Sequence, residues 1–405
     1  MSRASLSPSA PHAPLWLLAM LVFSGTVGVH IFVPALPSAA LDLGASAGTM
    51  QWTVSLYILG LAIGQLAYGP LSDRYGRRPV LMGGLVLYIV SGLAAALAPQ
   101  AQALIAARLF QALGGCAGMV LGRAMVRDTA VGGEAARRLA LMNLMVTIGP
   151  SFAPLFGGLL VSALGWRSVL VFLCLLGLVG LACAWQLLPE TGRPGSQAGA
   201  GVLMRHYRHL LQSRSFVGFA VGGGCATTSM YAFIAAAPFV FVDQLHRSIH
   251  EASVAIAILV SGMWLGSVLT SRLITRVSVQ RLLVRSNLLS VIAAFVFLAG
   301  TLLDRLSVPF VVVTVFVFTV GVGMASPTAL AQAISVDPQV IGSASGLYGF
   351  TQMTVGAFCT SLVALGSGNP ALAAALVLAG TGVLAQLCFW VAARHRSTSR
   401  LVGDA

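Results

Sequence analysis

The run Gly69-Pro70-Leu71-Ser72-Asp73-Arg74-Tyr75-Gly76-Arg77-Arg78 is the stretch that decides the fold. It holds three arginines and an aspartate, yet residues 45–72 before its charges and residues 79–107 after them carry no charge at all. A helix needs about 20 apolar residues to cross a bilayer, and both flanking segments reach that length. The run is therefore predicted to be a tight, charged turn between two membrane helices.

The composition of the whole chain indicates a membrane protein. Of its 405 residues, 58% are hydrophobic and only 8% are charged, whereas soluble domains carry about a quarter charged residues. The net charge of +13 comes from arginines that are spread thinly along the chain. Such charges beside apolar runs are typical of topology signals, so we expect a lipid bilayer as the surroundings and no nucleic-acid partner. The six cysteines lie inside apolar runs without metal-binding spacing, so no metal or cofactor is expected.

Charge-free runs predict an all-α membrane protein with twelve transmembrane helices. Backbone in lipid must be hydrogen-bonded internally, so runs of this length are expected to be helical. The predicted spans are 15–37, 50–72, 79–98, 100–122, 139–164, 168–188, 215–241, 252–271, 286–303, 308–333, 341–365 and 371–393.

A polar, glycine-rich interruption separates the sixth span from the seventh. It predicts an N-terminal six-helix half at residues 1–189, a cytoplasmic linker at 190–213 and a C-terminal six-helix half at 214–405. Two halves of this kind are typical of transporters.

The distribution of arginine predicts the orientation. If the N-terminus is inside, nineteen arginines lie on the inner side, three lie on the outer side, and Arg108 falls within a span, which accounts for all 23. Cytoplasmic loops are enriched in arginine and lysine. Both termini are therefore predicted to be cytoplasmic.

Two ionisable side chains fall inside predicted spans, where they are functional candidates because burying a charge is costly. His30 in span one can change its charge near neutral pH, and Pro34 has no N–H to offer the His30 carbonyl, which opens the helix locally. This pattern favours a proton or substrate site. The alternative is a neutral histidine that is hydrogen-bonded between helices.

Arg108 in span four stays charged at any physiological pH. It shares a helical face with Gln111, so the two side chains could offer hydrogen-bond donors to a cavity. The alternative is that Arg108 lies near the outer end of its span and extends toward the membrane surface.

Span five is unusually rich in residues that weaken helices, and it is predicted to be a bendable, closely packed helix at the interface of the halves. Ordinary packing of small residues is the other interpretation, and the two are compatible. The residues are Gly149, Pro150, Pro154, Gly157 and Gly158.

Aromatic and amide side chains in other spans are further candidates for lining a cavity. Many residues of these types in membrane proteins only pack between helices or lie at the membrane interface, so packing is the alternative for each. The candidates are Tyr57, Tyr231, Trp264, Gln332, Tyr348 and Gln352.

Short motifs along nearly the whole chain accompany the opening run. In the first half they are Pro34-Ala-Leu-Pro37, Gln51-Trp52-Thr53, Arg108-Leu-Phe-Gln111, Arg123-Ala-Met-Val-Arg127-Asp128, Ala153-Pro154-Leu-Phe-Gly157-Gly158 and Gly165-Trp166-Arg167. In the second half they are Tyr231-Ala-Phe-Ile234, Pro238-Phe-Val240 and Ser343-Ala-Ser-Gly346. With these motifs the chain resembles the Bcr/CflA-type drug-resistance transporters, which are proton-coupled members of the major facilitator superfamily.

The resemblance implies roles for several of these residues. Arg108 would match a membrane-embedded arginine associated with proton coupling, and span five would match an antiporter motif in which Ala140 and Ala153 replace two glycines. A cytoplasmic gate that holds the halves closed on the inside would comprise Gly69, Asp73, Arg74, Gly76, Arg77, Arg78, Arg127 and Asp128.

Span one departs from the pattern of the family. Many relatives have Asp-x-Tyr-x-Pro where this chain has His30-Ile-Phe32-Val-Pro34, so the acidic proton carrier is missing. Either His30 takes its role, or another group does, or the chain is not a standard proton antiporter.

We therefore expect a monomeric transporter that exports small amphipathic compounds in exchange for protons by alternating access. Proton-driven uptake of a nucleoside-like or other small metabolite is the alternative. A membrane-embedded enzyme would need nucleophiles, acid–base groups or metal ligands that converge within the spans. The sequence provides no plausible catalytic partner for His30 or for any cysteine. A channel would need a repeated filter or a charged ring, and neither is apparent.

Overall fold

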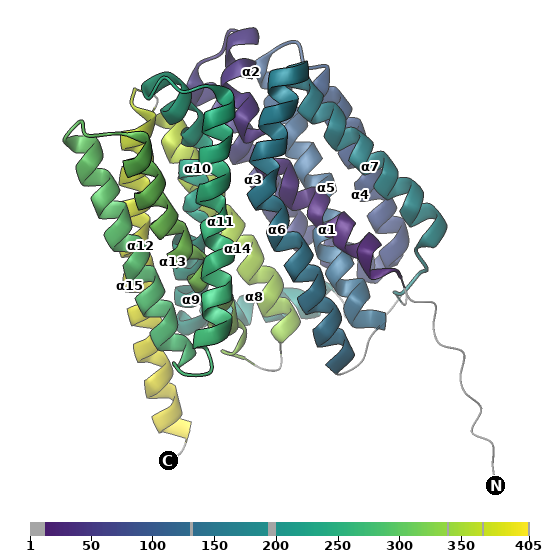
Figure 1. Ribbon diagram of the computed structural model, residues 1–405. Helices are drawn as coiled ribbons and strands as arrows, with labels where there is room; N and C mark the ends of the chain where they lie inside the picture. Colours follow the sequence, from purple (N-terminus) through teal and green to yellow (C-terminus); the bar gives the residue numbers. More distant parts are fainter. Residues whose placement is uncertain (1–12, 130–132, 193–199, 338–339, 367, 404–405) are drawn as a thin grey trace.

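The computed structural model describes residues 13–129, 133–192, 200–337, 340–366 and 368–403, and these ranges are almost wholly helical (Figure 1). The predicted all-α class is confirmed. Helix α1 begins and helix α15 ends at the same end of the bundle, the lower end in Figure 1. We call this the terminal end and the opposite one the distal end.

The first half of the chain forms long helices around α5, which packs against α1, α3 and α4. Side chains from these helices and from α7 make the largest hydrophobic cluster of the structure. The elements are α1 (Leu15–His30), the 3₁₀ turn η1 (Val33–Ala35), α2 (Leu36–Asp42), α3 (Ala47–Tyr75), α4 (Arg77–Ala96), α5 (Ala101–Thr129), α6 (Gly133–Leu164) and α7 (Arg167–Leu187).

The second half is arranged around α13, which packs against α9, α11 and α12. Its elements are α9 (Arg214–Thr228), α10 (Met230–Phe239), the π-helical turn η2 (Val240–Gln244), α11 (Ile249–Leu273), α12 (Val279–Leu302), α13 (Val308–Ile334), α14 (Ile341–Leu365) and α15 (Pro370–Gly403). Across the halves, α3 packs on α14 and α6 packs on α11.

The helices match the predicted spans. Within the described ranges, ten segments are long and apolar enough to cross a membrane, with α1 to α2 and α9 to η2 each counted as one. The remaining two predicted spans correspond to α6, which is apolar over Gly149–Leu164, and to α14. Several helices continue past the predicted span at the terminal end, because a helix can extend into water once its apolar residues have crossed the lipid.

One helix was not predicted. Residues 200–212 of the predicted linker form α8 (Ala200–Gln212), while residues 193–199 lie outside the described ranges. The segment is too polar to be predicted as a transmembrane span. Packing against the second half stabilises its helix, because Leu210 is buried there and Tyr207 is half-buried. The division into two halves and a linker stays a prediction.

Pro34 interrupts the first span as predicted. Helix α1 ends at His30, the 3₁₀ turn η1 contains the proline, and α2 then resumes the path. The proline has no N–H to donate to the carbonyl four residues earlier. Val33 of this turn packs in a cluster made mainly of second-half residues, so the broken segment joins the halves near the distal end.

Glycines allow α11 and α13 to approach each other closely. A Cβ atom added at Gly266 would lie 2.1 Å from the Val320 carbonyl oxygen, and one at Gly323 would lie 2.1 Å from the Met263 carbonyl oxygen. Neither contact is tolerable without moving backbone. Small residues of this kind let membrane helices make their main van der Waals contacts.

We expect Gly266→Val to lower the free energy of unfolding by roughly 1–3 kcal/mol, because the added atoms must push α11 away from α13. The matched control is Gly380→Val on α15, where nothing lies within 4 Å of an added Cβ. The measurement is the thermal unfolding midpoint of each purified variant in detergent. Equal midpoints for the two variants would contradict this account of the packing.

Candidate functional site

A cavity of about 1540 Å³ lies between the helices of the first and second halves. It begins at His30 and Tyr231 in the interior of the bundle and reaches Arg74 and Arg127 at the terminal end. Ligand pockets commonly measure about 300–1,000 Å³, so this space can hold a small molecule together with water. The turn η1 packs against α10 and α11 on the distal side of His30, and this contact closes that end.

His30 is the last residue of α1 and lies in the cavity wall. Its Nδ1 is 3.2 Å from the Thr26 carbonyl oxygen, and since a carbonyl can only accept, Nδ1 must donate. In the neutral ring Nε2 then carries the free lone pair. That nitrogen is buried and has no hydrogen-bond partner among the described residues. The ring of Tyr231 lies 5.9 Å away, centroid to centroid, from the other half of the chain.

Four methionines contribute to the wall around this closed end. Met119 comes from α5, Met230 from α10, Met263 from α11 and Met353 from α14. Unbranched thioether side chains adapt to irregular apolar shapes and are frequent on promiscuous binding surfaces. The wall is therefore suited to apolar bodies of more than one shape.

The second half adds polar groups to the wall. Gln352 donates from Nε2 to the Thr227 hydroxyl at 2.7 Å, and Thr228 donates to the Gln352 carbonyl at 2.8 Å. Tyr348 also lines the cavity, with its hydroxyl packed over Gly223, and the sequence predicted this tyrosine, Tyr231 and Gln352 as lining residues.

Tyr207 of α8 borders the terminal end of the cavity. Burial raises the pKa of the Tyr207 phenol, so it stays protonated and can donate a hydrogen bond at neutral pH.

Arg108 lies neither in the cavity wall nor at the membrane surface, contrary to both interpretations of the sequence. It is 1% exposed, and it donates to the Gln111 amide oxygen and to the Gly28 carbonyl oxygen, each at 2.6 Å. Its guanidinium also lies over the rings of Phe32 and Tyr57, at 4.9 and 4.0 Å from their centroids. Cation–π contacts gain strength when they are desolvated, which makes this apolar site tolerable for the charge.

Gly28 and His30 share the last turn of α1, so the hydrogen bond from Arg108 fixes the turn that carries the histidine. Arg108 and Gln111 therefore act on the cavity through α1 rather than by facing it.

Three of the predicted lining residues occupy other places. Tyr57 is fully buried and donates to the Gly25 carbonyl at 3.1 Å, inside the first half. Trp264 is 43% exposed, because the wall uses a different face of α11, formed by Val260, Met263 and Ser267. Gln332, near the end of α13, is buried outside the wall.

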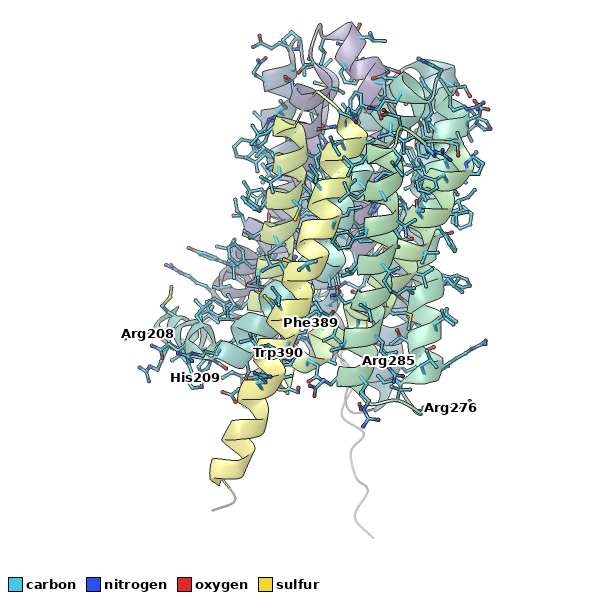
Figure 2. All side chains as sticks on the ribbon, turned by 90° about the vertical axis from the view of Figure 1, so that its left-hand side faces the viewer. Arg208, His209, Arg276, Arg285, Phe389 and Trp390 are labelled. Atoms are coloured by element: carbon cyan, nitrogen blue, oxygen red, sulfur yellow. The ribbon has the colours of Figure 1, made fainter. Side chains whose placement is uncertain are left out.

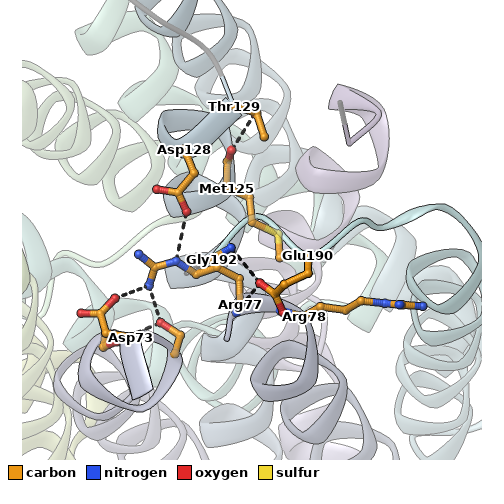
Figure 3. A network of polar contacts seen from close by, with 10 residues as sticks. Asp73, Arg77, Arg78, Met125, Asp128, Thr129, Glu190 and Gly192 are labelled. Carbon is orange, nitrogen blue, oxygen red and sulfur yellow. Dashed lines mark hydrogen bonds and ion pairs between the residues drawn. The ribbon is translucent and has the colours of Figure 1, made fainter. Parts of the chain in front are cut away.

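The predicted gate residues separate into two groups. Asp73, Arg77 and Asp128 form one cluster, with Arg77 2.8 Å from Asp73 and 3.1 Å from Asp128 (Figure 3). Arg74 and Arg127 line the cavity as Asp73 and Arg77 do, but among the described residues they form no ion pair. In this conformation the hydrogen bonds drawn in Figure 3 involve residues of the first half and the first residues of the predicted linker, Glu190 and Gly192.

Glu190 completes the cluster and was missed by the sequence analysis. Its carboxylate accepts from the backbone N–H groups of Arg77 and Arg78 at 2.9 and 3.1 Å, and from that of Gly192 at 2.7 Å. It thus caps the N-terminus of α4, where a negative charge is favoured. Gly76 has φ +96°, and a Cβ there would lie 2.7 Å from the carboxylate, so the glycine of the opening run makes room for this cap. No local signal links the two sites, which are more than 110 residues apart.

The glycines of α6 lie at helix crossings, Gly149 and Gly157 within the first half and Gly158 against the second half. Added Cβ atoms at Gly149 and Gly157 would collide with Phe23 and with the Ile31 carbonyl of the first span, at 1.9 and 2.0 Å. One at Gly158 would lie 2.1 Å from the Ser253 hydroxyl on α11. Pro150 lines the cavity, and Pro154 also lies inside the helix.

Comparison with known protein families matches residues 16–361 to the Major Facilitator Superfamily. The chain belongs to this superfamily. It is a multi-pass membrane transporter for a small-molecule substrate and not an enzyme. The expected twelve-helix arrangement of the superfamily is confirmed.

Relatives support the resemblance to drug-resistance transporters of the Bcr/CflA type. The uncharacterized MFS-type transporter YdgK of Bacillus subtilis is 30% identical over 387 residues, covering 94% of this chain and 95% of that protein. The multidrug resistance protein D of Escherichia coli is 29% identical over 383 residues, covering 93% and 94%. The chloramphenicol resistance protein of Pseudomonas aeruginosa is 33% identical over 263 residues, covering 64% and 62%.

A solved structure shares the fold. The D-xylose-proton symporter aligns with a TM-score of 0.77 and 16% sequence identity, covering 93% of this chain and 96% of that one. Identity this low supports the fold of this transporter and carries no information about its substrate.

We expect Glu190→Ala to lower the free energy of unfolding by about 1 kcal/mol, because the first turn of α4 loses its cap. Glu134→Ala is the matched control. Among the described residues, that carboxylate pairs with Arg138 one turn away, at 2.6 Å and partly exposed, where such a pair contributes about 0.5 kcal/mol or less. Denaturant titration in mixed micelles measures both losses. A larger loss for Glu134→Ala would refute the capping role.

Proposed function

We propose that this transporter exports small amphipathic compounds in exchange for protons by alternating access. It would act as a monomer in the bacterial inner membrane, with the terminal end of the bundle in the cytoplasm. The observation that carries the proposal is the cavity between the halves, which is closed on the distal side of His30 and extends to the terminal end. In the predicted orientation this is a state ready to receive a compound from the cytoplasm.

The methionine wall supports an amphipathic substrate. Met119, Met230, Met263 and Met353 offer an adaptable apolar surface, while Thr227 and Gln352 offer hydrogen bonds beside it. A compound with an apolar body and a few polar groups satisfies both surfaces. The names of the Escherichia coli and Pseudomonas aeruginosa relatives favour drug-like compounds and outward transport.

His30 is the proposed proton carrier. Its unpartnered Nε2 can take up a proton, which turns this nitrogen into a hydrogen-bond donor. It can also accept a hydrogen bond from a substrate, which then occupies the acceptor at the closed end of the cavity. Tyr231 faces the ring from the second half, so the charge of His30 acts where the halves meet. A proton on His30 and a bound compound can thereby favour different conformations, which is the requirement for coupled transport.

Arg108 is proposed as a positioning residue for this carrier. It holds the Gly28 carbonyl in the last turn of α1 and leaves His30 facing the cavity.

His30→Ala is expected to reduce pH-gradient-driven accumulation of chloramphenicol at least tenfold in proteoliposomes, while exchange of labelled for unlabelled compound persists. The matched control is His250→Ala, an exposed histidine of α11 outside the cavity wall, which is expected to retain driven transport. Driven accumulation that survives in His30→Ala would remove His30 from the coupling step. Accumulation only in vesicles of the opposite orientation would favour the uptake alternative.

Arg108→Lys is expected to retain folded protein but to lower driven transport roughly tenfold, because one ammonium group cannot reproduce the planar fork that joins Gln111 to Gly28. Arg108→Ala should also lose stability, by roughly 1–3 kcal/mol for each buried acceptor left without a donor. Transport rates in vesicles and thermal midpoints of the same preparations measure the two effects. A normal rate for Arg108→Lys would show that only the charge matters.

A further inference from the structure

Three arginines of the first half extend into the terminal part of the cavity without an anionic partner. Arg74 comes from the end of α3, and Arg123 and Arg127 come from successive turns of α5. All three side chains are exposed, and all three line the cavity. The exposed surface of Arg123 therefore faces the cavity. Among the described residues, none of the three makes an ion pair, and the one contact shown for Arg74 is with the Tyr75 ring, 5.1 Å away.

The arrangement is costly for the empty protein. Arg123 and Arg127 are four residues apart on one helical face, where like charges repel. Among the described residues that line the cavity, Asp73 is the one carboxylate, and it is already bound to Arg77 at 2.8 Å. Low-dielectric walls focus the resulting positive potential into the cavity and concentrate anions there.

The opposite wall adds to this potential. Gly342 and Ser343 in the first turn of α14 line the same part of the cavity, and no side chain in the described ranges caps this helix N-terminus. Asp337, which precedes α14 in the chain, is paired with His209 at 3.3 Å. Free backbone N–H groups and the helix dipole favour a negative charge at this position.

We propose that the terminal part of the cavity is an anion-binding site that takes a carboxylate or phosphate group of the transported compound. The substrate class is then small amphipathic anions, with the charged group between Arg123, Arg127 and the start of α14 and the apolar body against the methionines. This assignment rests on the proposed transport function. It also agrees with outward transport, because an inside-negative membrane potential drives anions out of a cell.

The test uses two probes, neutral chloramphenicol and its hemisuccinate, in which the same body is esterified with a succinyl chain that ends in a carboxylate. Binding of each is measured by calorimetry with the full-length protein in nanodiscs of phosphatidylcholine, so that no anionic headgroup competes. We expect the hemisuccinate to bind at least ten times more tightly than its parent. Added salt should weaken the hemisuccinate alone.

Arg123→Gln is expected to weaken hemisuccinate binding roughly tenfold or more, because a hydrogen bond to a charged group is lost, and to leave chloramphenicol within twofold. Arg123→Lys should retain most of the preference. The control is Arg285→Gln, at the terminal end but outside the cavity wall (Figure 2), which should alter neither affinity.

Several results would overturn the anion site. They are equal affinities of the wild type for the two probes, no detectable hemisuccinate binding, or an equal effect of Arg285→Gln. Slower transport with unchanged affinity in Arg123→Gln would also overturn it, because the arginine would then act only in closing the gate. Vesicle assays of the same preparations separate the two proposals. Tight hemisuccinate binding without driven transport refutes the export function but not the anion site. Driven transport of chloramphenicol without a preference for the anion refutes the anion site but not the export function.

Discussion

The absence of water in the bilayer is the constraint on which the structure depends. Backbone N–H and C=O groups in lipid must bond to each other, so the chain is helical wherever it crosses. The break at Pro34 is tolerated because η1 is buried in protein, packed against α10 and α11, rather than exposed to lipid. The same break ends α1 at His30 and places the histidine at the closed end of the cavity. The one proline thus affects both the contact between the halves and the position of His30.

The cost of burying charge sorts the arginines into three groups. Arg77 is neutralised by Asp73 and Asp128 in a cluster that organises the turn between α3 and α4. Arg108 is fully buried, and its charge is stabilised by two hydrogen-bond acceptors and two aromatic faces. Arg123 and Arg127 in the cavity wall have neither kind of compensation among the described residues, so water or a ligand must supply it.

The cavity therefore divides into regions with different chemistry. Methionines and His30 surround the closed end, where an apolar body and a proton can both be accommodated. Arginines and a helix terminus that no described side chain caps surround the terminal part, where a negative group is favoured. In our proposal the substrate contacts both regions, whereas the proton binds only at the closed end, on His30. Arg108 acts on the closed end alone, through the last turn of α1, and does not line the cavity.

The sequence by itself determined the number and position of the spans, the charged turn at Gly69 to Arg78 and the helix break before Pro34. These features follow from local hydropathy, charge and the missing proline N–H, none of which depends on distant residues. Only the tertiary structure decided which side chains meet. Glu190 caps α4 across 113 residues, and Arg77 reaches Asp128 across 51. Whether Arg108 faced lipid, cavity or protein depended on the rotation of α5 against α1, and the same kind of rotation turned Trp264 away from the cavity. A long apolar run predicts that a helix forms but not how that helix is rotated about its axis. In lipid only packing against neighbouring helices distinguishes one face of the helix from another.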